Sequence, residues 1–369
     1  MPGLQCKWFA NLLRPYLKCS QMNGRVFLLI ACFLPVIAWA QSFGGLGSKA
    51  ADEFATPQRN FVFDFPADHG AHPDYRIEWW YLTANLEDLA GVQYGLQWTL
   101  FRTAVAPGEE EGWSSPQVWF AHAAVTTPEA HFSTERFARG GIGQAGVTVE
   151  PFRAWIDEWK LEGPDMNSLS VQAASPDFAF DMDLLANGPL VFHGENGFSQ
   201  KSAEGQASYY YSQPFYKISG TLNLPEGDIL VTGSAWLDRE WSSQPLSDDQ
   251  KGWDWFSLSF ENGEKIMGFQ LRQSNGSYYT SATWIEANGE TQSYPDGAFM
   301  AEPLEETRVA GRDVPIRWRV RLPDRDLDAE VLALTPKAWM DVSIPYWEGP
   351  VGISGSHSGR GYLEMTGYE

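Results

Sequence analysis

From residue 57 onward, the sequence alternates short runs of aromatic and β-branched residues with turn-forming residues. Runs such as "VQYGLQWTLFRTAV" at 92–105 and "WDWFSLSF" at 253–260 are typical of strands. The Asn-Gly pairs inside 261–263 and 287–289 are typical of hairpin turns. No glycine pattern of a dinucleotide site or P-loop follows any of these runs. We therefore predict an all-β, antiparallel fold.

One stretch favours a helix. In "TPEAHFSTERFARGG" at 127–141, Thr127 can cap a helix, Pro128 suits its first position and a glycine pair would end it. We predict a helix over these residues.

The stretch "YRIEWWYLTANL" at 75–86 places an indole on each face of one predicted strand. Side chains alternate along a strand, so Trp79 and Tyr81 point to one side and Glu78 and Trp80 to the other. Neither face is then suited to water. We expect one face to line a barrel interior and the other to pack against a neighbouring domain or a flanking segment. Glu78 would supply acceptors for buried indole and hydroxyl donors.

The first forty residues are typical of a secretory signal peptide. An apolar run from Val26 to Ala40 follows Arg25 and ends in a small-x-small pattern, which predicts cleavage after Ala40 and a secreted or periplasmic protein. "LIAC", which ends at Cys32, offers the less favoured alternative of a lipid anchor, and Met22 is an alternative start. We expect residues 41–56 to be a flexible lead-in.

Removal of this segment would also remove all three cysteines, four basic residues and no acidic ones. The mature chain would then be stabilised by core burial without disulfides. Its formal charge would change from −21 to −25, because 22 basic residues would face 47 acidic ones. Such a surface repels phosphates, so we expect no nucleic-acid partner and no binding to anionic lipid headgroups.

The two halves of the chain resemble each other. "RIEWWYLTANL" followed by "YGLQWTLFR" is similar to "DREWSS" followed by "WDWFSL" and "MGFQLR". We therefore predict two domains, 57–228 and 229–369.

These motifs also resemble a known family. "HPDYRIEWWYLTANL", "FAHAAVT", "GSAWLDREWSS" and the terminal "YWEGPVGISGSHSGRGYLEMTGY" are similar to the AttH-like and carotenoid 1,2-hydratase (CrtC-like) family of secreted lipocalin-like proteins. The resemblance runs from about residue 60 to the C-terminus. It implies two lipocalin-like (calycin) antiparallel β-barrels side by side, the second starting near "GSAWLDREW".

The resemblance implies several activities. Relatives include hydratases that add water to a carbon–carbon double bond of isoprenoids and an enzyme that hydrates a prenylated isoflavonoid. Similar double barrels are linked to cyclisation of polyenes, and other members occur beside transporter components. Fold analogy alone does not choose among them.

Asp238, Glu240 and Trp241 form the candidate catalytic group. An apolar pocket would raise the pKa of either carboxyl, so that it protonates an alkene and nearby indoles stabilise the cation. We favour the alternative in which Arg239 pairs with a carboxylate and ties the two domains together. The hydratase branch has a histidine in or beside this motif, whereas this chain has Arg239 and no histidine between 194 and 356. That departure counts against hydratase activity.

Further candidates could contact a ligand. Arg102 is expected to pair with Glu78 across strands, and His122 is expected to point the same way as Val118 and Phe120. Trp347 is placed at a barrel mouth, with aromatic filling of the core as the alternative. The full set of predicted ligand-binding residues is Glu78, Trp79, Trp80, Tyr81, Arg102, His122, Arg239, Trp253, Trp255 and Trp347.

No hydrolase or metal motif stands out. The six histidines show no zinc-ligand spacing, and "SGSHSG" at 354–359 lacks the strand–turn–helix setting of a nucleophile elbow. We expect neither a metal nor another cofactor. The sequence thus favours binding of an apolar or amphipathic small molecule. The alternatives are a cofactor-free hydratase or cyclase and a non-catalytic accessory of an export or lipid-transport complex.

Overall fold

The computed structural model describes residues 53–368, and both sheets described below belong to one unit of the fold. The predicted signal peptide, the cysteines and most of the predicted lead-in lie outside the described residues. The described end of the lead-in packs against the rest of the protein and differs in this from the predicted flexible segment. Phe54 is buried, and the Ala55 amide donates to the Asp74 carbonyl. Within residues 53–368, no helix is long and apolar enough to cross a membrane.

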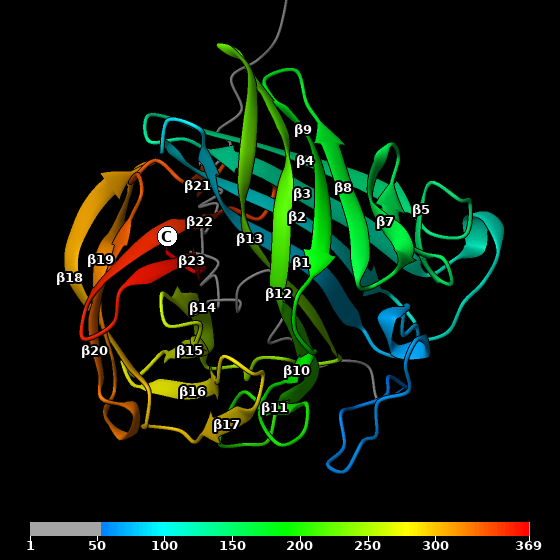
Figure 1. Cartoon of the computed structure of the whole chain (residues 1–369). Coiled ribbons are helices and arrows are strands. Elements are labelled where there is room, and N and C mark those ends of the chain that lie inside the picture. Colours follow the sequence, from blue (N-terminus) through cyan, green and yellow to red (C-terminus); the bar gives the residue numbers. More distant parts are fainter. Residues whose placement is uncertain (1–52, 369) are drawn as a thin grey trace, which may run out of the picture. The chain divides into compact units, whose positions relative to one another are not determined.

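The first of two curled antiparallel sheets contains 13 of the strands in residues 53–368 (Figure 1). These strands are β1 Ile77–Asp88, β2 Gln93–Ala104, β3 Gln117–Thr126, β4 His131–Arg139, β5 Ala145–Val149, β6 Phe152–Ile156, β7 Trp159–Asp165, β8 Ser168–Ala174, β9 Ala179–Ala186, β10 Val191–Phe192, β11 Phe198–Gln200, β12 Ala207–Leu224 and β13 Gly227–Ser242. Their order is β4-β3-β2-β1-β13-β12-β9-β8-β7-β6-β5, and β10 and β11 also pair with β12.

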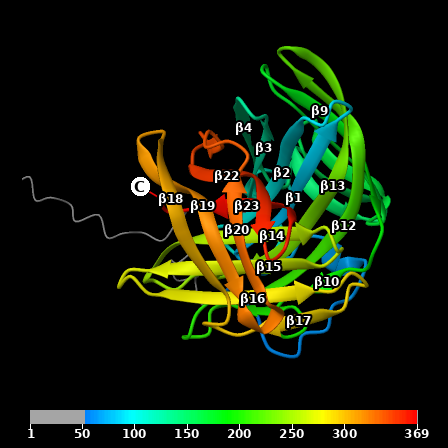
Figure 2. The ribbon, with the colours of Figure 1, turned by 60° about the vertical axis from the view of Figure 1, so that its left-hand side comes forward.

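The second sheet contains 10 strands of the described chain (Figure 2). They are β14 Gln250–Phe260, β15 Lys265–Gln273, β16 Tyr278–Ile285, β17 Thr291–Tyr294, β18 Met300–Val309, β19 Arg312–Leu322, β20 Leu327–Ala333, β21 Trp339–Met340, β22 Tyr346–Gly355 and β23 Gly359–Met365. Their order is β17-β16-β15-β14-β23-β22-β20-β19-β18, and β21 pairs with β22. The all-β prediction is confirmed, and the two sheets are consistent with a double lipocalin-like barrel.

The predicted hairpin turns are present. Gly263 and Gly289 have φ angles of 92° and 90°, where a residue with a Cβ would be strained. They connect β14 to β15 and β16 to β17, as the Asn-Gly pairs indicate.

The helix predicted over residues 127–141 is wrong. Residues His131–Arg139 form β4, which pairs along its whole length with β3. Thr127 does cap a backbone turn, because its Oγ1 accepts from the amides of Glu129 and Ala130 at 3.2 and 2.9 Å. That turn starts a hairpin, and strand pairing overrides the local helix signals.

Side chains alternate between the two faces along each strand, and those on the inner face fill the interior of each barrel. Trp80, Leu82 and Trp98 lie in the core of the first sheet, and Phe256 and Trp347 lie in the core of the second. The opposite faces of the same strands meet between the sheets, where Tyr81 and Trp255 share a third apolar cluster. The two-faced reading of residues 77–84 is therefore confirmed. One face fills a barrel interior and the other packs against the second sheet.

The chain passes from one sheet to the other later than predicted. The boundary at residue 228 falls inside β13, close to the turn that joins β13 to β12, and both of these strands belong to the first sheet. The second sheet begins at Gln250, so the "GSAWLDREW" motif completes the first sheet instead of opening the second. The long β13 pairs with β1 on one side and with β12 on the other.

Candidate functional site: an aromatic cavity between the sheets

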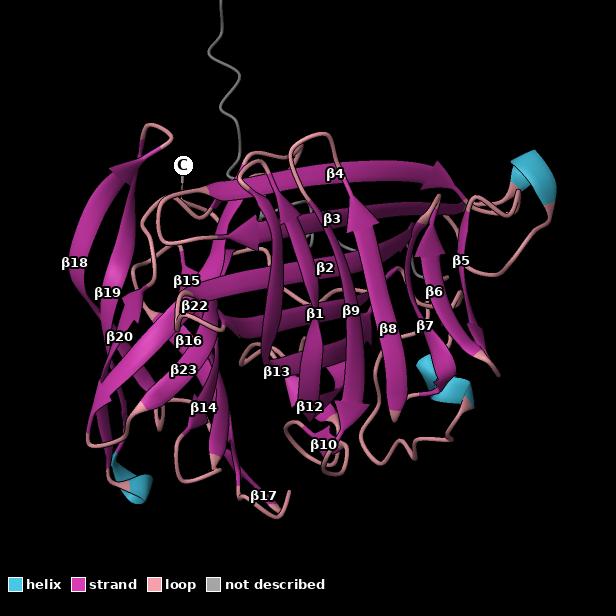
Figure 3. Ribbon diagram, turned by 45° about the horizontal axis from the view of Figure 1, so that its top comes forward, coloured by secondary structure: helices cyan, strands magenta, loops and turns pink. Residues whose placement is uncertain are grey.

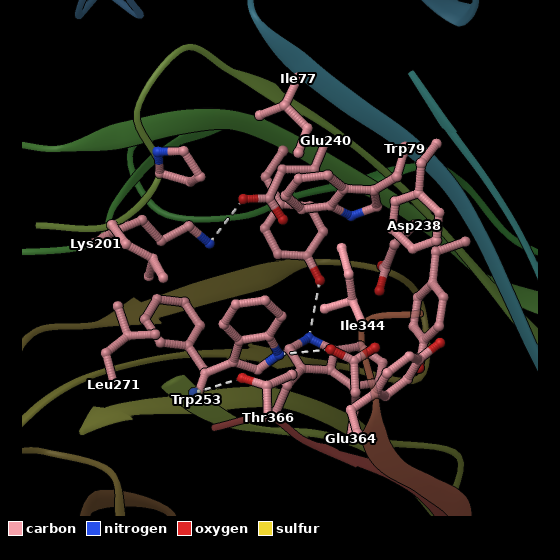
Figure 4. A pocket seen from close by; sticks show the side chains of 18 of the residues that line it. Ile77, Trp79, Lys201, Asp238, Glu240, Trp253, Leu271, Ile344, Glu364 and Thr366 are labelled. Carbon is pink, nitrogen blue, oxygen red and sulfur yellow. Dashed lines mark hydrogen bonds and ion pairs between the residues drawn. The ribbon is translucent and has the colours of Figure 1, made fainter. Parts of the chain in front are cut away.

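A cavity of about 230 Å³ lies between the two sheets (Figure 4). Its walls are mainly aromatic and aliphatic, and a few ionisable side chains interrupt them. The lining residues are Ile77, Trp79, Tyr81, Phe101, Thr103, Phe120, His122, Lys201, Tyr210, Asp238, Glu240, Pro245, Leu246, Trp253, Trp255, Phe269, Leu271, Ile344, Tyr346, Glu364 and Thr366. The cavity thus lies outside both barrel interiors, which are filled by their own cores.

Asp238 lies in the wall formed by the first sheet. It is 1% exposed, and its Oδ1 accepts hydrogen bonds from Ser212 and, at 2.7 Å, from the Trp236 indole. Burial raises the pKa of Asp238 to about 7, although hydrogen bonds from Ser212, Trp236 and Tyr210 favour the carboxylate.

Ser212 connects Asp238 to a buried histidine. The His193 Nε2 lies 2.6 Å from the Ser212 Oγ, and both side chains are fully buried. Because the Ser212 hydroxyl donates to Asp238, His193 must donate from Nε2. A serine nucleophile needs the histidine between serine and carboxylate. Here the serine is in the middle, so these three residues position Asp238 and do not form a hydrolase triad.

Glu240 is held by an ion pair at the same wall. Lys201 Nζ lies 2.9 Å from its Oε1, which also accepts from Ser208. Lys201 also lies over the rings of Tyr210 and Phe269, at 4.9 and 4.3 Å from the centroids. The positive charge of Lys201 and the negative charge of Glu240 therefore offset each other in an aromatic environment.

The opposite wall carries a second carboxyl group with a shifted pKa. Glu364 on β23 accepts from the Trp253 indole, and burial raises the pKa of Glu364 to about 7. Directly across the strand pair lies Glu348 on β22, which accepts from the Tyr81 hydroxyl. Burial, together with the charge of Glu364, raises the pKa of Glu348 well above its usual range. Near neutral pH, Asp238 on one wall and Glu364 on the other are therefore each partly protonated.

His122 lies at one end of the cavity, as its strand position predicts. Its Nδ1 is 2.9 Å from the Tyr346 hydroxyl, and burial lowers the pKa of His122 to about 3. The ring is therefore neutral at physiological pH and serves as a hydrogen-bonding group.

The structure brings together only part of the predicted site. Trp79, Tyr81, His122, Asp238, Glu240, Trp253 and Trp255 line the cavity. Glu78, Trp80, Arg102, Arg239, Trp241 and Trp347 do not. Alternation explains the split in the Asp238–Trp241 motif, since Asp238 and Glu240 face the cavity while Arg239 and Trp241 face the other side of β13.

The residues on that other side form a buried ionic cluster. Glu78 pairs with both Arg102 and Arg239, and it also accepts from the His72 amide at 2.8 Å. The two arginines hold the pKa of Glu78 well below its usual range, against the effect of its burial. The Trp241 ring stacks on His72 at 3.9 Å between centroids. The predicted Glu78–Arg102 pair is confirmed.

Two predicted positions are corrected. Arg239 does pair with a carboxylate, but its partner Glu78 belongs to the same sheet, so the pair does not tie the two domains together. Trp347 is fully buried in the core of the second sheet, where its indole donates to the Pro336 carbonyl, and it does not lie at a barrel mouth.

Several cavity residues were not predicted. Tyr210 and Glu364 lie in stretches whose strand character is evident, but nothing local indicates which face they present. Lys201 precedes β12 in a segment without a motif. Among the described residues, no group of three or more His, Cys, Asp or Glu side chains is arranged to hold a metal ion.

Known proteins resemble this chain in fold. A crystal structure of an AttH protein from Nitrosomonas europaea matches with a TM-score of 0.76 and 33% identity, covering 86% of this chain and 100% of that one. Kievitone hydratase from Nectria haematococca matches with a TM-score of 0.66 and 16% identity, covering 87% and 98%. CghA with Sch210972 matches with a TM-score of 0.54 and 12% identity, covering 89% and 98%. The last two similarities indicate a shared fold only.

No curated protein matches the chain. The family model described as AttH-like matches residues 55–368, which is nearly the whole of the described range. With this match and the 33% identity to the Nitrosomonas protein, the chain belongs to the AttH-like family.

Proposed function

We propose that this protein binds an apolar or amphipathic small molecule, of the isoprenoid or lipid class, in the cavity between its two sheets. The observation that carries the proposal is the cavity itself, about 230 Å³ in volume and walled by aromatic side chains with a few polar groups. Ligand sites in proteins have this composition. The secreted or periplasmic location predicted from residues 26–40 is part of the proposal.

A second function, cofactor-free hydration or cyclisation, is favoured by Asp238 and Glu364. Both carboxyl groups face the cavity with a pKa of about 7, so each holds a proton near neutral pH and can also release it. Among the structural neighbours, kievitone hydratase is named a hydratase. The absence of a histidine between 194 and 356 distinguishes this chain from the hydratase branch, so any such chemistry would be carried by these carboxyls.

In the hydration reaction, Asp238 would give its proton to one carbon of a double bond. The other carbon becomes a cation, which the faces of Trp79 and Trp255 stabilise. Water adds to this cation, and its extra proton returns to the Asp238 carboxylate. The net change is addition of water to the double bond, with no cofactor and no oxidant.

The test begins with native mass spectrometry and organic extraction of residues 41–369 purified from the periplasm. A bound apolar molecule of defined mass supports the binding function and supplies the compound for turnover assays. A protein that stays free of ligand against a panel of terpenoids and lipids would contradict both small-molecule functions. Crosslinking to a transporter component would then favour the accessory role.

Asp238→Asn separates the two small-molecule functions. A pure binder should keep its affinity, because the amide oxygen still accepts from Ser212 and Trp236. An enzyme should lose turnover while it still binds. Asp183→Asn is the matched control, since Asp183 is exposed on β9. Turnover that survives Asp238→Asn but not Glu364→Gln would assign the acid to the second sheet.

A further inference from the structure

Four aromatic residues form one continuous row across the outer face of the first sheet. Trp79 on β1 lies opposite Phe101 on β2, Phe101 opposite Phe120 on β3, and Phe120 opposite Phe137 on β4. The rings of Phe101 and Phe120 stack at 4.5 Å and 10°, and those of Phe120 and Phe137 at 6.1 Å and 26°. We call Trp79, Phe101, Phe120 and Phe137 the aromatic row.

The aromatic row leads out of the cavity. Its first three members line the cavity and are partly buried, whereas Phe137 lies beyond the lining and is 54% exposed. β4 is the first strand in the order of its sheet, and Figure 3 shows it at the margin beside β3 and β2. The row therefore runs from the buried centre to the edge of the sheet. A large exposed aromatic ring on an edge strand promotes association with other chains, so its presence calls for a functional explanation.

The neighbouring row on the same face is polar and covered. Register places Asp238, Tyr81, Thr99, His122 and Glu135 side by side from β13 to β4.

The first residue of β22 and the segment that precedes it cover the outer part of this polar row. Tyr346 contacts His122, and the amide of Ser343 donates to Glu135 at 3.0 Å. This contact covers the row next to the aromatic row and leaves the exposed ring of Phe137 uncovered.

We propose that the aromatic row binds the elongated apolar chain, acyl or prenyl, of the ligand. The polar or reactive end of that ligand would lie at the β13 end of the row, where Glu240 is opposite Trp79 and Asp238 is two residues away on the same face. The chain would leave the protein at Phe137. This proposal rests on the proposed function and deepens it, because it states the shape of the ligand. Four strand spacings separate β13 from β4, which gives a path of about 19 Å. A compact ligand would fill the cavity and leave Phe137 without a contact.

The test uses primary alkan-1-ols from hexan-1-ol to hexadecan-1-ol, titrated into the whole mature protein and followed by calorimetry. Affinity should rise with each added carbon until the chain spans the row and then level off. Phe137→Ala should weaken the longest alcohols by about five- to tenfold, because it removes one aromatic contact, and should leave hexan-1-ol unchanged. Leu185→Ala is the matched control, since Leu185 on β9 is 60% exposed and lies away from the row.

The failures of the two proposals differ. If no alcohol of any length binds, the small-molecule function fails and this inference fails with it. If alcohols bind but Phe137→Ala affects short and long chains equally, or affects none, only the aromatic-row proposal is overturned. A loss of self-association in Phe137→Ala, with unchanged alcohol affinity, would assign the ring to a protein contact and would also overturn it.

Discussion

Glu348 and Glu364 lie directly opposite each other on β22 and β23, and Glu364 is part of the wall that the second sheet presents to the cavity. Burial raises the pKa of both carboxyl groups, and the charge of Glu364 raises the pKa of Glu348 further. Glu348 is also fixed by the Tyr81 hydroxyl of the first sheet, so the pair links the two walls of the site. The raised pKa of Glu364 is therefore mainly a consequence of its burial between the two sheets.

Glu364→Gln should flatten the dependence of stability on pH. The folded-state pKa of Glu364 is about 7, against an ordinary value of 4.5, so its contribution to stability is complete below pH 4.5 and is lost as the pH rises to about 7. The loss amounts to about 3 kcal/mol across that window. Urea unfolding of both proteins at several pH values measures the difference, which cancels the opposing effects of the buried histidines.

The control for this prediction is Glu226→Gln, at an exposed glutamate in the β12–β13 turn. It should follow the wild-type curve. If Glu364→Gln keeps the wild-type slope between pH 4.5 and 7, Glu364 is ionised in the folded protein and is not an acid at neutral pH.

Glu78→Gln should destabilise the protein by about 3–5 kcal/mol, because it leaves two buried arginines without their counter-charge. Arg102 and Arg239 are each 1% exposed, so water cannot replace the carboxylate. The free energy of unfolding measures the loss. Glu305→Gln provides the comparison, since its ion pair with Arg317 is exposed and contributes at most about 1 kcal/mol. Similar losses for both variants would contradict a structural role for the Glu78 cluster.

Ser212→Ala should raise the pKa of Asp238, because it removes a hydrogen bond that favours the carboxylate. It should also cost about 1–3 kcal/mol, since the buried His193 loses its partner. The carboxyl carbon signal of Asp238, followed by NMR against pH, measures the shift.

Ser199→Ala is a strict control for this substitution. Ser199 is 1% exposed, and its hydroxyl has no hydrogen-bond partner among the described residues. Its removal should be close to neutral and should leave the Asp238 titration unchanged. Equal effects of the two substitutions would mean that Ser212 does not position Asp238.

The parts of the fold that the sequence predicted depend on neighbours along the chain. The two faces of the strand containing Trp79 and Trp80 follow from alternation. The Glu78–Arg102 pair follows from two strands joined by a short turn, and the side on which His122 lies follows from one strand. Each of these needs only a local register, which hydrophobic patterning and turn residues specify.

The parts that failed depend on the order of distant strands. Glu78 and Arg239 are 161 positions apart, and Tyr81 and Glu348 are 267 apart. The pairing of β13 with β1 joins strands that are far apart in the sequence, and no local pattern predicts it. The boundary between the sheets and the partner of Arg239 both depend on this pairing, so the sequence alone could not predict them. The helix predicted over residues 127–141 was wrong for another reason. Thr127 can cap either a helix or a hairpin turn, and the pairing of residues 131–139 with β3 selects the strand.

Lys201→Met tests whether Lys201 and Glu240 contribute to stability as an ion pair. Lys201 is 7% exposed and Glu240 is 5% exposed, so the single substitution leaves an unpaired carboxylate in an aromatic setting. We expect a loss of about 3–5 kcal/mol in unfolding free energy. Glu240→Gln alone should cost a similar amount, because the ammonium group is then unpaired. The double variant should recover most of the loss, since the buried charges disappear together.

The same cycle tests the link between this ion pair and Asp238. The charge of Glu240 contributes to the raised pKa of Asp238, so an unbalanced Glu240 in Lys201→Met should raise that pKa further, whereas the double variant should lower it. Urea unfolding at fixed pH and the NMR titration of Asp238 measure the two effects in the same four proteins. Additive losses in stability, with the same pKa of Asp238 in all four proteins, would mean that Lys201 and Glu240 act independently. Their charges would then not influence the ionisation of Asp238.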